Sequence, residues 1–182
     1  MKLADSSIVL VPGFGDSTQD YWVNRWQAKL SMAQTVQLDN WNHASKAHWV
    51  SAIIDAVEHA SKPVVLVGHS LGVAAIAHAV PHISKPVAGA FLVALSDWNR
   101  PDLLPGVTHD FAPLPQHPLP FKSVLVASRN DPYCDYGMAE TFARQWHSTL
   151  IDAGESGHIN TESGHGPWPE GLMSFAGFLN KL

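Results

Sequence analysis

This sequence is poor in cysteine and in charged residues, and both shortages narrow what the protein can be. Its 182 residues include a single cysteine, Cys134, so an intrachain disulfide is impossible and a reducing, cytoplasmic location is expected. Charged side chains make up 15% of the chain and hydrophobic ones 46%, a composition that excludes a disordered protein. Length and composition together predict one folded domain over residues 1–182.

Basic residues and long apolar runs are also scarce. The 11 Lys and Arg residues are outnumbered by 16 Asp and Glu residues, and the formal net charge is −5. Such a surface does not attract nucleic acid or an anionic membrane, so neither is expected as a partner. No apolar run approaches a membrane span, and the run Ile8–Val11 is too short for a signal-peptide core. These features do not predict the oligomeric state, which stays open.

Short apolar runs rich in β-branched residues predict the strands of a mostly parallel sheet. They are continuously apolar, which is typical of strands buried on both faces. The six runs are Ser7–Val11, Thr35–Leu38, Pro63–Val67, Val87–Leu95, Lys122–Ala127 and Ser148–Ile151.

Apolar residues at the spacing of one helix face occur between and after these runs. The groups are Trp22, Trp26 and Leu30; Val50, Ile53, Ile54 and Val57; and Leu172, Phe175, Ala176 and Leu179. Pro169 is placed to begin the last helix. Alternating strands and helices predict a three-layer α/β fold with helices on both faces of the sheet. The segment Trp98–Phe121, with six prolines, is predicted as either a lid over a site or a packed surface loop.

The strongest functional signal is the pentapeptide Gly68–Gly72, whose sequence is GHSLG. It follows the apolar run Val64–Val67 and precedes an alanine-rich helix. In the G-x-S-x-G motif, a sharp strand-to-helix turn exposes the serine hydroxyl at the sheet edge, and the glycines avoid collisions there. The pattern predicts Ser70 as a nucleophile, and the alternative is a glycine-rich turn that only reverses the chain.

A serine hydroxyl is a weak nucleophile and needs a base that a third group orients. In α/β-hydrolases the chain order is serine, acid, histidine. Asp131, in the loop after Lys122–Ala127, is the predicted acid, although an aspartate there could instead cap a following helix. Asp97, one strand earlier, is the alternative acid. The base follows the last strand, where both His158 and His165 qualify and spacing separates them only weakly.

Two backbone N–H groups are predicted to stabilise the oxyanion that develops on a substrate carbonyl. One belongs to Leu71, directly after the serine, and the other to Phe14, in the loop Pro12–Gly15 after the first run. The glycines of that loop do not form a dinucleotide-binding motif, because Thr18 stands where the third glycine is required.

Aromatic residues and histidines complete the candidate features. Trp98 and Trp168 lie in loops at the predicted active edge and are predicted to bind substrate in an apolar acyl pocket. Trp22, Trp26 and Trp49 lie on predicted helices and are expected in the core. The 11 histidines show no spacing typical of metal ligands, so neither a metal nor a cofactor is expected.

With these motifs in hand, the sequence resembles the family of the animal retinoblastoma-binding serine hydrolase and its bacterial relatives. The resemblance covers nearly the whole chain. It is carried by the segments Val11–Gly15, Gly68–Gly72, Ser128–Tyr133, Gly157–Asn160 and Gly166–Gly171.

The resemblance implies a three-layer α/β-hydrolase fold without a large cap domain. It also implies a catalytic serine, acid and base, which fall on Ser70, Asp131 and His158, and so it favours His158 as the base. The Leu-x-Cys-x-Glu motif of the animal member is missing, because Pro132 and Tyr136 flank Cys134 in place of leucine and glutamate. That protein partner is therefore not expected.

Together these features predict a serine hydrolase that cleaves a small ester, or a thioester or amide, through an acyl-enzyme intermediate. Ser70 would attack the carbonyl, His158 would take and return the proton, and Asp131 would hold the imidazole. A non-catalytic binding protein on the same scaffold and an acyltransferase remain alternatives, because a fold does not decide a function.

Overall fold

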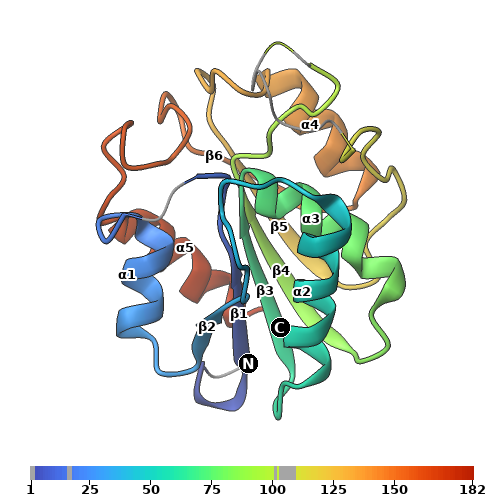
Figure 1. Ribbon diagram of the computed structural model, residues 1–182. Coiled ribbons are helices and arrows are strands. Elements are labelled where there is room, and N and C mark those ends of the chain that lie inside the picture. The colour runs from blue at the N-terminus through green and yellow to red at the C-terminus, as the bar shows by residue number, and fades with distance from the viewer. Residues whose placement is uncertain (1–2, 16–17, 101, 103–109) are drawn as a thin grey trace.

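A single parallel sheet organises the computed structural model, which describes residues 3–15, 18–100, 102 and 110–182 (Figure 1). The strand order is β2-β1-β3-β4-β5-β6, and every neighbouring pair of described strands is parallel. The predicted sheet of about six strands is thus confirmed. The strands are β1 (Ser7–Val11), β2 (Ala33–Thr35), β3 (Val64–His69), β4 (Val87–Val93), β5 (Lys122–Ala127) and β6 (Thr149–Asp152).

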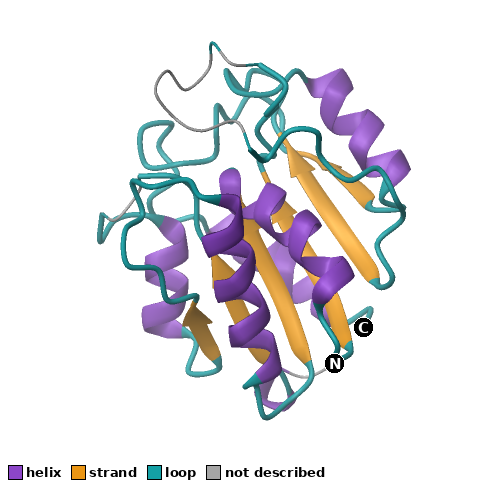
Figure 2. Ribbon diagram, turned by 45° about the vertical axis from the view of Figure 1, so that its right-hand side comes forward, coloured by secondary structure: helices purple, strands orange, loops and turns teal. Residues whose placement is uncertain are grey.

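Helices cover both faces of the sheet and make the three layers that the sequence predicts (Figures 1 and 2). On one face lie α1 (Trp22–Lys29) and α5 (Pro169–Leu179), and on the other lie α2 (Lys46–Glu58), α3 (Leu71–Ala79) and α4 (Tyr136–Gln145). Short 3-10 turns, η1 and η2, cover Leu3–Asp5 and Val80–His82. None of the helices in the described part of the chain has both the length and the apolar character needed to cross a bilayer.

Side chains of the central strands point alternately into two apolar layers. On β1, Ile8 and Leu10 pack with α1 and α5, whereas Val9 and Val11 pack with α2 and α3. All four are fully buried, and each such burial contributes about 1.5–3 kcal/mol. This double burial explains why the strand sequences are continuously apolar.

The helical tryptophans belong to these layers, as predicted. Trp22 and Trp26 pack between α1, α5 and the sheet, and Trp49 packs in the opposite layer. All three are at most 4% exposed.

Strands β1 and β5 have their predicted limits, and β3 and β6 differ from theirs by one or two residues at each end. The differences in β2 and β4 have structural reasons. β2 covers Ala33–Thr35 instead of Thr35–Leu38, because this edge strand pairs only with β1 and the ladder, not the apolar run, sets its ends. β4 ends at Val93, two residues before Leu95, because Ala94 has φ +50°, which turns the chain out of extended geometry.

Helix α4 is missing from the sequence prediction, although a signal was present. Its buried residues Ala139, Phe142 and Ala143, with Trp146 just beyond it, follow helical spacing.

The segment Trp98–Phe121 lies partly outside the described residues, which omit 101 and 103–109. Within residues 110–121 the structure has no helix or strand, and Phe111 and Leu114 are buried in the core. This part is packed, as one of the two predictions requires, and the lid alternative stays a prediction.

Candidate active site

Ser70 lies in the turn between β3 and α3 with a strained backbone. Its φ of 53° and ψ of −117° fall outside the regions that side-chain-bearing residues normally adopt. A Cβ on Gly72 would lie 2.1 Å from the carbonyl oxygen of Val11, so α3 can begin this close to β1 only with glycine there. The strand, turn and helix match the predicted G-x-S-x-G context.

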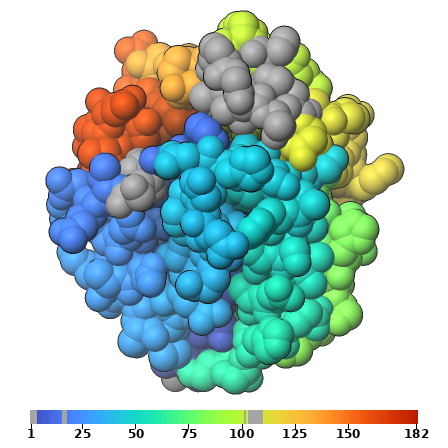
Figure 3. Space-filling view, in the orientation of Figure 1, coloured from blue at the N-terminus to red at the C-terminus, as the bar shows by residue number. Residues whose placement is uncertain are grey.

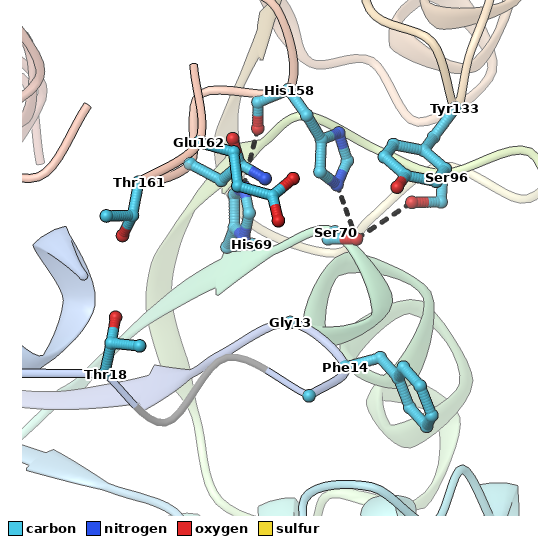
Figure 4. A pocket seen from close by; sticks show the side chains of 12 residues that line it. Gly13, Phe14, Thr18, His69, Ser70, Ser96, Tyr133, His158, Thr161 and Glu162 are labelled. Atoms are coloured by element: carbon cyan, nitrogen blue, oxygen red, sulfur yellow. Dashed lines mark hydrogen bonds between the residues drawn. The ribbon is translucent and has the colours of Figure 1, made fainter. Parts of the chain in front are cut away.

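Three side chains from distant parts of the chain meet at this edge of the sheet. The Nε2 atom of His158 lies 2.8 Å from Oγ of Ser70 (Figure 4), and its Nδ1 atom lies 2.9 Å from each carboxylate oxygen of Asp131. Because a carboxylate accepts hydrogen bonds, Nδ1 carries the proton and Nε2 is left to accept from the serine hydroxyl. The side chains of His158 and Asp131 are only 9% and 3% exposed, so the pair is largely shielded from water.

The loops after β5 and β6 hold Asp131 and His158. Asp131 accepts a hydrogen bond of 2.9 Å from the backbone N–H of Tyr133, which fixes the carboxylate in its own turn. The ring of Tyr133 packs against that of His158, with centroids 4.5 Å apart. β5 and β6 are neighbours, which brings both loops to one edge of the sheet.

The alternative acid and base form other contacts. Asp97 accepts hydrogen bonds of 3.1 and 3.2 Å from the backbone and side chain of Asn99. His165 lies 3.2 Å from the hydroxyl of Ser163 and packs edge-on near Trp168. In the described structure, neither Asp97 nor His165 forms a hydrogen bond with Ser70.

Ser96 is a site residue that the sequence analysis missed. Its hydroxyl oxygen lies 2.9 Å from that of Ser70, and the residue is 4% exposed (Figure 4). No motif surrounds Ser96, and the only available signal was its position just beyond a central strand.

The predicted oxyanion donors differ from their neighbours in hydrogen bonding. The N–H of Gly13 donates to the hydroxyl of Tyr21 at 3.1 Å, and the N–H of Ser70 donates to the carbonyl of Val93 at 3.0 Å. Within the residues that the structure describes, the N–H groups of Phe14 and Leu71 have no acceptor. Both remain available to a ligand.

A cavity of about 430 Å³ opens onto these groups, a size suited to a small molecule. The loops after β1 and β6 form two of its walls, and they lie side by side at the surface, where blue and orange-red segments meet (Figure 3). The described lining residues are Gly13, Phe14, Gly15, Thr18, His69, Ser70, Ser96, Tyr133, His158, Asn160, Thr161 and Glu162 (Figure 4).

Trp98 and Trp168 are not among the described residues that line this cavity, so their predicted role in binding substrate finds no support there. Trp98 is 3% exposed and packs 5.3 Å from the ring of Phe111. Trp168 is 7% exposed and stacks on Trp26. Both indoles are packed into the apolar core, where they bury a large apolar surface.

His69, which precedes the serine, is a second buried histidine at the site. Its Nδ1 lies 2.6 Å from the hydroxyl of Tyr21, and its Nε2 lies 2.9 Å from the backbone carbonyl oxygen of His158. Burial and then the nearby His158 imidazole lower the pKa of His69 to about 3, so its ring is neutral near pH 7. Neither Tyr21 nor His69 was predicted as a site residue.

The fold is that of the α/β-hydrolase class. The family model described as "Serine hydrolase" matches residues 8–177, and the chain belongs to this serine hydrolase family. The resemblance seen in the sequence is thereby confirmed at the level of the family and its bacterial relatives.

Solved structures agree with this assignment. A YdeN-like hydrolase from Pectobacterium atrosepticum is 34% identical, with a TM-score of 0.86 over 96% of this chain and 91% of that one. The ydeN gene product of B. subtilis is 17% identical, with a TM-score of 0.80 over 96% and 99%. An esterase from Thermogutta terrifontis with bound butyrate is 15% identical, with a TM-score of 0.71 over 100% and 85%. At 17% and 15% identity, the last two structures show only that they have the same fold as this chain. Among curated proteins, none matches this chain.

Proposed function

We propose that this serine hydrolase cleaves a small carboxylic ester through an acyl-enzyme intermediate, with Ser70, His158 and Asp131 as its catalytic triad. One observation carries the proposal: an unbroken row of hydrogen bonds runs from the Asp131 carboxylate through His158 to the Ser70 hydroxyl. Thioesters and amides undergo the same acyl transfer and are secondary candidates.

The reaction follows from the direction of these hydrogen bonds. Ser70 Oγ attacks the ester carbonyl carbon while Nε2 of His158 takes its proton. Asp131 holds the imidazole in the required tautomer and stabilises the imidazolium. The N–H groups of Phe14 and Leu71 stabilise the negative charge on the carbonyl oxygen.

Collapse of this tetrahedral species breaks the ester bond. The alcohol leaves with the proton from His158, and Ser70 stays acylated. A water molecule then gives a proton to Nε2, attacks the acyl carbon and releases the carboxylic acid, so that Ser70 recovers its proton. The original Ser70 proton leaves with the alcohol and a proton from the water replaces it, so Ser70, His158 and Asp131 all end the cycle in their starting states.

Two further observations support a short ester as substrate. The cavity of about 430 Å³ accommodates a small acyl group and a small alcohol. The Thermogutta terrifontis esterase, which has this fold, holds butyrate in one structure and is phosphonylated by cyclosarin in another. A cytoplasmic location belongs to the proposal, because a lone cysteine is typical of a reducing compartment.

The test is covalent labelling with a fluorophosphonate, followed by hydrolysis of p-nitrophenyl acetate and butyrate. The native protein should be labelled once per chain and should hydrolyse at least one ester, and Ser70→Ala should do neither. Ser51→Ala, an exposed serine on α2, is the matched control and should behave as the native protein. Absence of labelling in the native protein, or labelling that survives Ser70→Ala, would reject the proposal.

A separate measurement distinguishes a hydrolase from an acyltransferase. Faster acyl transfer to an added alcohol than to water would indicate an acyltransferase.

A further inference from the structure

A buried row of hydrogen bonds joins the loop after β1, the end of β3 and the loop after β6 without including the proposed triad side chains. It starts at the Gly13 N–H, passes through the Tyr21 hydroxyl and the His69 ring, and ends at the His158 backbone carbonyl. The three distances are 3.1, 2.6 and 2.9 Å. Tyr21 is 0% and His69 2% exposed, so water does not compete for these groups. We call this row the Tyr21–His69 bridge.

The direction of every proton in the bridge is determined by its two ends. A carbonyl oxygen only accepts, so the Nε2 atom of His69 carries the ring proton. A neutral imidazole has one such proton, so Nδ1 accepts and the Tyr21 hydroxyl donates to it. The same hydroxyl oxygen accepts from the Gly13 N–H. The bridge therefore runs one way, from Gly13 to His158, and no member can reverse its role alone.

We propose that Tyr21 and His69 are positioning residues for the reaction, which set the loop of the oxyanion donor and the backbone of the base relative to Ser70. This inference rests on the proposed hydrolase function and adds residues to its machinery. Figure 4 shows His69 beneath His158 and beside Ser70, with its hydrogen bond to the His158 carbonyl.

The first consequence concerns the oxyanion donors. Because the Tyr21 hydroxyl occupies the Gly13 N–H, the next donor along the loop, Phe14 N–H, is the one left for the substrate oxygen. The loop also lies close to the turn between β3 and α3, since a Cβ on Gly13 would come within 3.1 Å of both His69 Nδ1 and Ser70 Cβ. The bridge thus sets the distance between the oxyanion donor and the nucleophile.

The second consequence concerns the base. His158 is held at its ring by Asp131 and at its backbone by His69, so both the position and the tilt of its imidazole are restrained. The His69 and His158 rings lie with centroids 5.0 Å apart. A neutral His69 lets His158 become positively charged during the reaction without repulsion from its neighbour.

Tyr21→Phe tests this role, because it removes only the hydroxyl and keeps the ring that packs on Trp22 and His69. With activity normalised to fluorophosphonate-titrated sites, kcat should fall about 10- to 100-fold while KM stays within about twofold. The rate of fluorophosphonate labelling should fall by a similar factor. Tyr136→Phe, a tyrosine on α4 stacked by Arg129, is the matched control and should leave both rates unchanged. If Tyr21 has only a structural role, the Tyr21→Phe variant should contain fewer sites that fluorophosphonate can titrate, but each of those sites should react at the native rate.

A second measurement does not depend on the variant's folding. Nitrogen-15 NMR of the native protein should show His69 protonated at Nε2 alone, with no titration between pH 8 and pH 5. Titration in that range, protonation at Nδ1, or a Tyr21→Phe rate equal to the native rate would each overturn the bridge. A native protein that is not labelled at all would instead reject the proposed hydrolase function. The two failures are therefore distinct.

Discussion

The hydroxyl oxygens of Ser70 and Ser96 lie 2.9 Å apart, and both residues are buried at the cavity. Ser70 must donate its own proton to Nε2 of His158, so the hydrogen bond between the serines is donated by Ser96. A donor aimed at the nucleophile stabilises the negative charge that Oγ acquires as it loses its proton. Ser96 therefore contacts a reacting atom of the proposed mechanism.

Ser96→Ala should lower kcat/KM about fivefold, because a neutral hydrogen bond contributes about 1 kcal/mol. Ester hydrolysis by the variant and by the Ser51→Ala control measures this. A loss as complete as that of Ser70→Ala would mean that Ser96 has a larger role than a donor to Ser70.

His158→Ala should lower kcat by roughly 10⁴-fold or more, since loss of the base in a triad removes most of the catalysis. His165→Ala should stay within about threefold of the native rate, because His165 bonds to Ser163 and not to Ser70. Steady-state ester hydrolysis separates the two. A larger loss in His165→Ala than in His158→Ala would contradict the proposed triad.

Asp131→Asn should reduce kcat by about 10⁴-fold, because an amide no longer selects the imidazole tautomer that the base requires. Asp97→Asn should instead keep kcat per titrated site near the native value, since Asp97 holds a turn through Asn99. Equal losses in the two variants would remove the distinction between the acid of the triad and its neighbour.

Gly72→Ala should destabilise the fold by about 3 kcal/mol, because the new Cβ would meet backbone oxygens of Val11 and Pro12 at 2.1 and 2.7 Å. Gly177→Ala on α5 is the matched control, since its Cβ meets nothing within 4 Å, and it should stabilise by about 0.5–1 kcal/mol. Urea unfolding of both variants gives the two values. A Gly72→Ala variant as stable as the native protein would contradict the close packing of α3 on β1.

Cys134 should be unreactive towards a thiol reagent at pH 8. Burial, and then the charges of Asp131 and Asp97, raise its pKa to about 12, so the neutral thiol dominates far above pH 8. In the unfolded chain the thiol ionises near pH 9, so above that pH the buried thiol makes unfolding more favourable. Ellman's reagent should react rapidly only after denaturant is added. Rapid reaction of the native protein would show that the thiol is accessible.

The sequence predicted the parts of this protein that depend on local pattern. Continuous apolar runs identified the strands, and five of the six, all except β2, agree with the structure within two residues at each end. A run of this kind is buried on both faces wherever it lies in a parallel sheet, so its own composition reveals it. The sharp turn at Ser70 could also be predicted from the sequence, because such a turn restricts which residues fit on either side of the serine.

Only the tertiary structure decided which distant groups meet. Ser70 and His158 are 88 positions apart, and the neighbouring order of β3, β4, β5 and β6 brings their loops to one edge. Spacing alone could not separate His158 from His165, and nothing local marked Ser96 or the pairing of Tyr21 with His69. The sequence could not place the indoles of Trp98 and Trp168 either, because whether an indole faces a cavity or the core depends on what packs against it.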